Sequence, residues 1–425
     1  MKINRELLER VNPVFNTAKM TVFQMAELGD ENAKKISEAM HLTLEETQGE
    51  VDEDEMQVNC TVLETRYRAI AELAKTTGCP TVVDLPCGYT PRAIEFAEEG
   101  RPYVGLDLPA AIVDAEPVIM SLIEEDKRHL VRFKGIDATN YPSLKEVFDS
   151  IQGEVCITTE GLLMYFADSE IGELCTNIRR LLAEHGGCWL LADAEVSMQY
   201  VVMAQAILGE RFMEVMKKGV ERTSEKSDVD VGSRTLVVSP NEDVPENIKK
   251  AMLFLGRYGL KAERLIAADY VPELESLKRL SPEKAATVRN SMTKFAFWKI
   301  TPIEGVRLDA SGESDGEMHI DAVLMGSYLE LTLTGRVDSL SAPKLLRFFE
   351  RISDENEIKA ITVRCANLEY ISSAGLRVLL IMQKKCSGGV TLNGINELVR
   401  EIVEQTGFVD ILNVEGASGA SDDDY

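Results

Sequence analysis

The sequence predicts an α/β protein with two domains, a larger one built on a mostly parallel sheet and a smaller α/β unit. Its 425 residues exceed what one hydrophobic core usually serves, since single cores stop growing at roughly 250 to 300 residues. Strand and helix patterns alternate along most of the chain, which is typical of parallel sheets with helices on both faces. A polar segment with glycine and serine at 303–317 is expected to be the linker between the two domains.

The larger domain is expected over residues 1–302 and begins with a helical part that extends to about residue 75. Within that part, the carboxylate-rich stretch 45–55 is expected to be a solvated loop. A helix over 62–75 follows, and beyond it buried strands alternate with helices, including a short helix over 92–97. The expected strands are 81–85, 103–106, 155–158, 188–192, 262–267 and 295–301.

The smaller domain is expected over residues 318–414. Leu329, Leu331 and Leu333 alternate with polar residues, which is the period of a half-buried strand. An amphipathic helix follows from Ala342. The remaining expected elements are strands at 360–364, 390–392 and 409–412 and helices at 375–384 and 397–405. Residues 415–425 are expected to form a disordered acidic tail.

The charge balance limits the classes of partner. Asp and Glu number 71 against 46 Lys and Arg, a formal net charge of −25, so we expect no binding to nucleic acid. No apolar run approaches the roughly 18 to 20 residues that span a bilayer, and the first residues lack the apolar core of a secretory signal. We therefore expect a cytoplasmic protein without membrane contact. The cysteines include no C-x-x-C pair and the histidines show no ligand spacing, so neither disulfides nor a metal site is expected.

A candidate ligand site follows the first buried strand. The loop after this strand contains Gly88 and leads directly into a helix, the position at which open α/β sheets bind nucleotides. A glycine lets a ligand approach the backbone, and the helix start offers unpaired N–H groups to a carboxylate. About 23 residues beyond Asp84 the next strand ends at Asp107, whose carboxylate could accept from two ribose hydroxyls. An ordinary glycine turn followed by an incidental acid is the alternative interpretation.

The segment Thr159–Phe166, T-E-G-L-L-M-Y-F, follows another expected strand. With this segment the chain resembles the leucine carboxyl methyltransferase family, class I SAM-dependent O-methyltransferases with an E-G-L-x-x-Y-type segment after the fourth strand. The resemblance covers roughly residues 15–302. It implies a Rossmann-like class I methyltransferase sheet and S-adenosyl-L-methionine (SAM) or its product SAH as ligand. It also implies a carboxylate or hydroxyl of a small molecule or protein as the methyl acceptor.

By this resemblance, Asp107 would hold the ribose, and Asp137 with its neighbour Ala138 would close on the adenine ring. No residue can be named as a catalyst, because a carboxylate acceptor is already ionised at neutral pH and needs no general base.

The methionine part of SAM would lie over Asp84 and Gly88 by the same resemblance. Glu160 would lie near the methionine amino group, and Arg66 would pair with the methionine carboxylate. An exposed surface charge is the alternative for Arg66, since Arg68 lies nearby.

One departure from the family separates two hypotheses. Where a glycine is usual just after the first strand, this chain has Pro86 and Cys87, and Pro91 interrupts the loop again. Proline removes an N–H and restricts φ. The first hypothesis is therefore a methyltransferase, and the second is an inactive SAM or SAH sensor. A NAD-dependent oxidoreductase is weaker, since the loop lacks G-x-G-x-x-G spacing. For Cys87, a small buried thiol is favoured over a nucleophile.

The C-terminal domain carries two serines between a strand and a helix, in the segment I-S-S-A-G-L. Serine is favoured at a helix start because its oxygen accepts from the first free N–H groups. With this segment and L-T-G-R-V-D at a strand end, the chain resembles the bacterial STAS domains of anti-sigma-factor antagonists. The resemblance implies that Ser373, or alternatively Ser372, is phosphorylated by an anti-sigma-type serine kinase. It implies as partner either this kinase or another protein of a STAS pathway. Ser372 stands where an aspartate is often found in that family.

Overall fold

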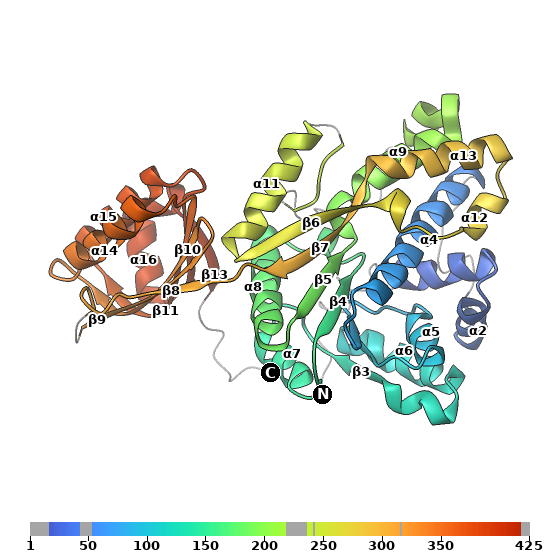
Figure 1. Ribbon diagram of the computed structural model, residues 1–425, viewed down its shortest axis with the longest axis horizontal. Coiled ribbons are helices and arrows are strands. Elements are labelled where there is room, and N and C mark those ends of the chain that lie inside the picture. Colours follow the sequence, from blue (N-terminus) through green and yellow to red (C-terminus); the bar gives the residue numbers. More distant parts are fainter. Residues whose placement is uncertain (1–16, 43–52, 218–235, 241–242, 315–316, 418–425) are drawn as a thin grey trace. The chain divides into compact units, whose positions relative to one another are not determined.

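The computed structural model describes residues 17–42, 53–217, 236–240, 243–314 and 317–417. The chain divides into two compact units (Figure 1). One comprises Met1–Asp168, Arg180–Ala251 and Ala262–Thr301, and the other comprises Ser169–Arg179, Met252–Lys261 and Pro302–Tyr425. Separate hydrophobic cores underlie the N-terminal sheet and the C-terminal sheet, which agrees with the two folds predicted from the sequence.

The N-terminal domain is built on a seven-stranded sheet with the order β3-β2-β1-β4-β5-β7-β6. Strands β1 to β5 pair in parallel, and β7 runs antiparallel to β5. The strands are β1 (Thr81–Asp84), β2 (Tyr103–Asp107), β3 (Val131–Gly135), β4 (Val155–Thr159), β5 (Gly187–Leu191), β6 (Leu260–Ile266) and β7 (Ala296–Pro302). The chain leaves β1 toward β2 and returns on the other side of β1 as β4, so the direction of winding reverses there. Ligands of open α/β sheets bind at such a switch point.

Helices connect these strands and cover the sheet (Figure 1). They are α2 (Glu31–Ala39), α4 (Glu53–Thr76), α5 (Arg92–Glu98), α6 (Pro109–Leu122), α7 (Tyr141–Phe148), α8 (Asp168–His185), α9 (Val196–Leu208), α11 (Val244–Arg257), α12 (Glu275–Lys278) and α13 (Pro282–Ser291). Strand β1, T-V-V-D, is buried over its whole length, as expected of a strand inside a parallel sheet that helices cover on both faces.

The acidic stretch predicted to be a loop is only partly described. Residues 43–52 lie outside the described residues, but Glu53, Asp54 and Glu55 form the first turn of α4. The prediction of a loop is therefore wrong at these three positions. Carboxylates are stabilised at a helix N-terminus by the helix dipole, so a run of acids can begin a helix as well as form a loop.

The C-terminal domain has a six-stranded sheet with the order β13-β12-β11-β10-β9-β8. Its elements are β8 (Val306–Leu308), β9 (Met318–Met325), β10 (Tyr328–Val337), α14 (Ala342–Glu355), β11 (Ala360–Ile371), α15 (Ser373–Lys385), β12 (Val390–Ile395), α16 (Glu397–Gln405) and β13 (Asn413–Ala417). Strands β10 to β13 are parallel, and β9 is antiparallel to β8 and β10. The alternating leucines of β10 are at most 1% exposed, as their period predicts.

Two boundaries of this domain differ from the prediction. Val306–Leu308, inside the expected linker, forms β8 and pairs with β9. The last strand is Asn413–Ala417 rather than 409–412, because Phe408–Asp410 is a 3-10 turn after Gly407. Val409 and Ile411 are each 41% exposed, so their alternation did not reflect burial. The strand also takes the first residues of the expected tail, and residues 418–425 lie outside the described part of the chain.

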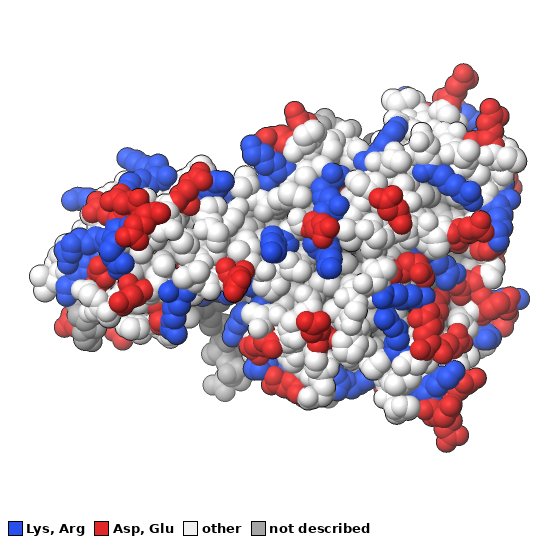
Figure 2. All heavy atoms as spheres, in the orientation of Figure 1, with Lys and Arg blue, Asp and Glu red and all other residues white. Residues whose placement is uncertain are grey.

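The surface in view is mixed in charge. Figure 2 shows lysine and arginine interspersed with aspartate and glutamate over the face in view. In the part of the chain that the structure describes, no helix is both long and apolar enough to cross a bilayer.

Candidate functional site

Three predicted carboxylates lie at the carboxyl ends of neighbouring strands. Asp84 ends β1, Asp107 ends β2, and Glu160 directly follows β4. Since β1 lies between β2 and β4 and all three strands are parallel, these residues meet at one edge of the sheet, beside the switch point. This edge is the candidate ligand site.

Arg92, the first residue of α5, joins two of these carboxylates. Its side chain is 2% exposed, and its Nη1 donates to both Asp84 oxygens at 3.0 and 2.9 Å. Its Nη2 donates to Glu160 Oε2 at 2.8 Å, and its guanidinium lies 4.6 Å from the centre of the Tyr67 ring. One buried cation therefore ties the loop after β1 to the loop after β4.

Glu160 also accepts from Arg66, whose Nε lies 2.9 Å from Glu160 Oε1. Burial by itself raises the pKa of Glu160, but the guanidinium groups of Arg66 and Arg92 outweigh it, so the pKa is lowered. Glu160 is therefore ionised at neutral pH. The structure thus brings Arg66, Asp84 and Glu160 together, and it places Arg66 inside the site rather than on an open surface, with a side chain 13% exposed.

Asp84 is fully buried beneath this group. Besides Arg92, its carboxylate accepts from the Tyr103 hydroxyl at 2.9 Å and from the Thr158 hydroxyl at 2.6 Å. All of these donors belong to the protein, so Asp84 acts on the site by holding Arg92.

Asp107 lies at the neighbouring strand end and meets the glycine loop. Its Oδ2 accepts from the Gly88 N–H at 2.8 Å and its Oδ1 from the Leu108 N–H at 2.7 Å. Burial raises the pKa of this carboxyl to about 6, more than the two backbone N–H groups lower it. Gly88 has a φ of +53°, a conformation that glycine adopts without strain. The end of β2 and the glycine loop are therefore joined through Asp107 and Gly88.

Asp137 and Ala138 follow β3. Asp137 is exposed, and its Oδ1 accepts from the N–H and the hydroxyl of Thr139 at 2.8 and 2.7 Å, while Ala138 is buried. Among the described residues, no hydrogen bond joins Asp137 to Arg66, Asp107 or Glu160.

Two residues of the site were missed from the sequence. Besides Arg92, Asp193 is 1% exposed and accepts from the N–H groups of Gly161, Leu162 and Leu163 at 2.6 to 3.0 Å. It thereby fixes the loop that carries Glu160. A signal was present, since Asp193 follows a buried strand closely, as Asp107 ends one.

Cys87 is not placed as a nucleophile. It is 3% exposed, and burial, with the charges of Asp107 and Asp84, raises the pKa of its thiol well above the usual range. A thiol of this kind stays protonated, which agrees with the small buried thiol favoured from the sequence.

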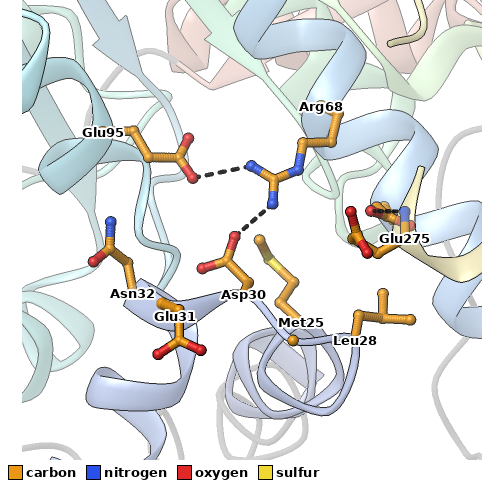
Figure 3. A pocket seen from close by; sticks show the side chains of 10 residues that line it. Met25, Leu28, Asp30, Glu31, Asn32, Arg68, Glu95 and Glu275 are labelled. Atoms are coloured by element: carbon orange, nitrogen blue, oxygen red, sulfur yellow. Dashed lines mark hydrogen bonds and ion pairs between the residues drawn. The ribbon is translucent and has the colours of Figure 1, made fainter. Parts of the chain in front are cut away.

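A separate pocket of about 330 Å³ lies among α2, α4, α5 and α12 (Figure 3). Arg68 crosses it and donates to Asp30 at 2.6 Å and Glu95 at 3.3 Å. Glu64, which also lines the pocket and is buried, accepts from the N–H groups of Glu275 and Ser276. These carboxylates have partners within the protein, so the pocket is a crevice between helices that are cross-linked by ion pairs.

The described residues contain one cluster of metal-ligating side chains, Asp149, Glu184 and His185. Lys145 already binds both carboxylates, at 2.6 and 3.1 Å, and both are exposed. This arrangement is a surface ion-pair group.

In the C-terminal domain, the two serines have different environments. Ser372 is the N-cap of α15, and its hydroxyl accepts from the Gly375 N–H at 3.3 Å. Ser373 is the first helical residue and is exposed. An added Cβ at Gly375 would lie 2.7 Å from Val337 Cγ1, so glycine lets this helix start approach β10. Of the two hydroxyls, the one of Ser373 faces solvent.

These observations describe a two-domain α/β protein with a candidate ligand site at the switch point of the larger sheet and a serine-capped helix start in the smaller domain. A family model described as "STAS domain" matches residues 319–419. A putative anti-sigma factor antagonist of Bordetella bronchiseptica is 34% identical over 92 residues, covering 21% of this chain and 78% of the relative. Through this C-terminal region, the chain belongs to the STAS domain family. An anti-sigma factor antagonist structure from Mycobacterium paratuberculosis is similar too, at 15% identity and a TM-score of 0.22, covering 24% of this chain and 88% of that one.

The N-terminal part is similar to solved methyltransferases at low identity. Magnesium protoporphyrin IX methyltransferase from Synechocystis PCC 6803, with bound SAH, is 12% identical with a TM-score of 0.32, covering 55% of this chain and 87% of that one. The SAM-dependent methyltransferase SibL is 13% identical with a TM-score of 0.33, and the match covers 67% of this chain and 73% of that one. The predicted fold class is confirmed: a Rossmann-like, mostly parallel α/β sheet precedes a STAS domain.

Proposed function

We propose that the N-terminal domain binds SAM or SAH at the edge formed by β1, β2 and β4. The observation that carries this proposal is Asp107, a half-buried carboxylate at the end of β2, held against the glycine loop by the Gly88 N–H. A carboxylate oxygen has lone pairs left after one hydrogen bond, so Asp107 can still accept from a ribose diol. Arg66 and Glu160 offer opposite charges for the amino-acid part of the ligand.

The activity that we propose is methyl transfer to a carboxylate or hydroxyl oxygen. SAM would supply an activated methyl group, so the protein needs mainly to position the acceptor and exclude water. The buried network of Arg92 and Asp84 and the loop clamp of Asp193 would hold the ligand-facing side chains in place. The resemblance of the E-G-L-L-M-Y segment to carboxyl methyltransferases supports oxygen as the acceptor atom.

Calorimetry of the full-length protein with SAM and with SAH tests the ligand, and methyl-labelled SAM with cell extract tests the transfer. We expect saturable binding of both nucleosides and a labelled product. Failure to bind either nucleoside would refute the proposed site.

Pro86 and Pro91 in the glycine loop favour a second candidate, an inactive sensor of SAM or SAH. The labelling experiment separates the two. Binding without any labelled product, under conditions in which a known methyltransferase labels its substrate, would favour the sensor.

We further propose that the STAS domain is the regulatory output and that its partner distinguishes the phosphorylated from the unphosphorylated form of Ser373. The relative in Bordetella bronchiseptica is named a putative anti-sigma factor antagonist, which supports a partner protein in such a pathway, for example a serine kinase. A phosphate at Ser373 would lie at a helix N-terminus, where the helix dipole tolerates negative charge.

For this site we expect kinase labelling of wild type and of Ser372→Ala, but not of Ser373→Ala. Ser372 accepts the capping hydrogen bond and is half-buried, so its replacement should lower stability by about 1 kcal/mol without removing the phosphate. Phosphopeptide mass spectrometry identifies the labelled residue. Labelling of Ser373→Ala at the wild-type level would move the phosphosite elsewhere.

A further inference from the structure

Two segments from the middle of the chain belong to the C-terminal unit. They are Ser169–Arg179, the first part of α8, and Met252–Lys261, which includes the end of α11. Within this unit they contact the face of the six-stranded sheet that points away from the hydrophobic core of the STAS domain. Glu330, Thr362 and Arg364 mark this face, because they alternate along their strands with core residues. Thr362 is 5% exposed, so this polar face is covered there rather than solvated.

Polar contacts join the two segments to the sheet. Arg179 Nη2 lies 3.3 Å from Glu330 Oε1, and Arg364 Nη2 donates to Glu330 Oε2 at 3.0 Å. The Thr362 hydroxyl donates to the carbonyl oxygen of Arg257 at 3.1 Å. Glu330 is 12% exposed, and a poorly solvated charge is costly unless it is paired. The ion pairs of Glu330 therefore favour the state in which the segments lie against the sheet.

Two glycines allow the close packing of this unit. A Cβ added at Gly256, in α11, would overlap the Tyr328 ring of β10, and one at Gly172, in α8, would overlap the Tyr258 hydroxyl. Tyr258 in turn donates to Glu415 of β13 at 2.5 Å. A side chain at either glycine would force the elements apart, so the packing of both segments is specified by the sequence.

Helix α8 continues directly from the loop that carries Glu160. This loop begins after β4, and α8 begins at Asp168. Asp193 holds the first part of the loop by accepting from three of its N–H groups. The far end of the loop leads into Ser169–Arg179, which belongs to the C-terminal unit. Movement of this segment is therefore passed to the loop of the ligand site through only a few residues.

We propose that the outer face of the STAS sheet is an internal docking surface for Ser169–Arg179 and Met252–Lys261, and that docking fixes the loop that carries Glu160. A change in the STAS domain that loosens the docked segments then loosens one wall of the ligand site. The reverse holds by linkage, because two coupled equilibria influence each other by the same free energy. The effect on a ligand rests on the proposed nucleoside site, whereas the docking itself does not.

Gly256→Leu tests the docking in the full-length protein. Leucine suits a helix better than glycine does, so α11 keeps its form, but the new side chain cannot fit against Tyr328. By hydrogen exchange with mass spectrometry we expect a loss of protection in residues 169–179 and 160–166. By calorimetry we expect the affinity for SAH to fall roughly twofold to thirtyfold. Adding Tyr328→Ala, which frees the space, should recover most of both losses.

Glu330→Arg tests the docking through charge. The substitution turns the attraction of residue 330 for Arg179 and Arg364 into repulsion, so it should cause the same two losses. Glu350→Arg is the matched control, because it makes the same change of charge at an exposed position of α14. This control should keep the wild-type protection and the wild-type affinity for SAH.

The outcomes separate the two parts of the proposal. Wild-type protection of residues 169–179 in both Gly256→Leu and Glu330→Arg would overturn the docking. Loss of protection there, with residues 160–166 and the affinity for SAH unchanged, would overturn the coupling to the ligand site. If wild type bound no SAH, the proposed function would fail, and the exchange of residues 160–166 would still decide this inference.

Discussion

Replacing Arg92 by methionine should lower the free energy of unfolding of the N-terminal domain by about 3–5 kcal/mol. Methionine fills much of the space of the arginine side chain but carries no charge. Asp84 therefore stays buried without a cation, and Glu160 loses one of its two arginine partners. Denaturation by urea, followed by tryptophan fluorescence, measures the effect. Trp189 and Trp298 lie in β5 and β7 and are the two tryptophans of the chain, so this signal reports on the N-terminal domain alone.

Arg68→Met is the control for this experiment, since Arg68 also binds two carboxylates but its side chain is 29% exposed. Because water reaches Arg68 and can solvate its partners in part, we expect a smaller loss than in Arg92→Met. Lowering the pH should reduce the difference in the free energy of unfolding between wild type and Arg92→Met, because the unpaired carboxylates of the variant can take up protons in the folded state. A loss in Arg92→Met no larger than in Arg68→Met would contradict the role of this network.

Asp107→Ala should weaken binding of SAH by roughly tenfold to a hundredfold, the effect of losing hydrogen bonds to a charged group. Asp107→Asn separates charge from local structure, because the amide oxygen can still accept from the Gly88 N–H. Calorimetry with both variants gives the affinities. Wild-type affinity in both would remove Asp107 from the site.

The same carboxyl predicts how binding depends on pH. Burial raises the pKa of Asp107 to about 6, and the ionised form is the one that accepts from a ribose diol. Affinity for SAH should therefore be constant well above pH 6 and fall roughly tenfold per pH unit well below it. Glu160, whose pKa is lowered by Arg66 and Arg92, should not contribute in this range. The affinity of Asp107→Asn for SAH should not change near pH 6. If it still fell there, the titrating group would be another residue than Asp107.

The strands of the N-terminal sheet could be predicted because their burial leaves a direct mark on the sequence. Strand β1 is entirely buried, with Val82 and Val83 at its centre, and Asp107 stands out as the acid that ends the next strand. The start of α4 was harder to predict, because Glu53, Asp54 and Glu55 suit a solvated loop and a helix start equally well. The end of the C-terminal domain was mistaken for a similar reason, since Val409 and Ile411 alternate like a strand but are partly exposed in a turn.

The sequence by itself determined the two folds, the glycine loop after β1 and the serine-bearing helix start, because these depend on local patterns of apolar, glycine and capping residues. Only the tertiary structure decided which charges neutralise one another. Arg66 in α4, Arg92 in α5 and Glu160 after β4 are far apart along the chain and meet only in the folded domain. Pairing of buried charges depends on distance in space and on the exclusion of water, and neither quantity can be read from the order of the residues.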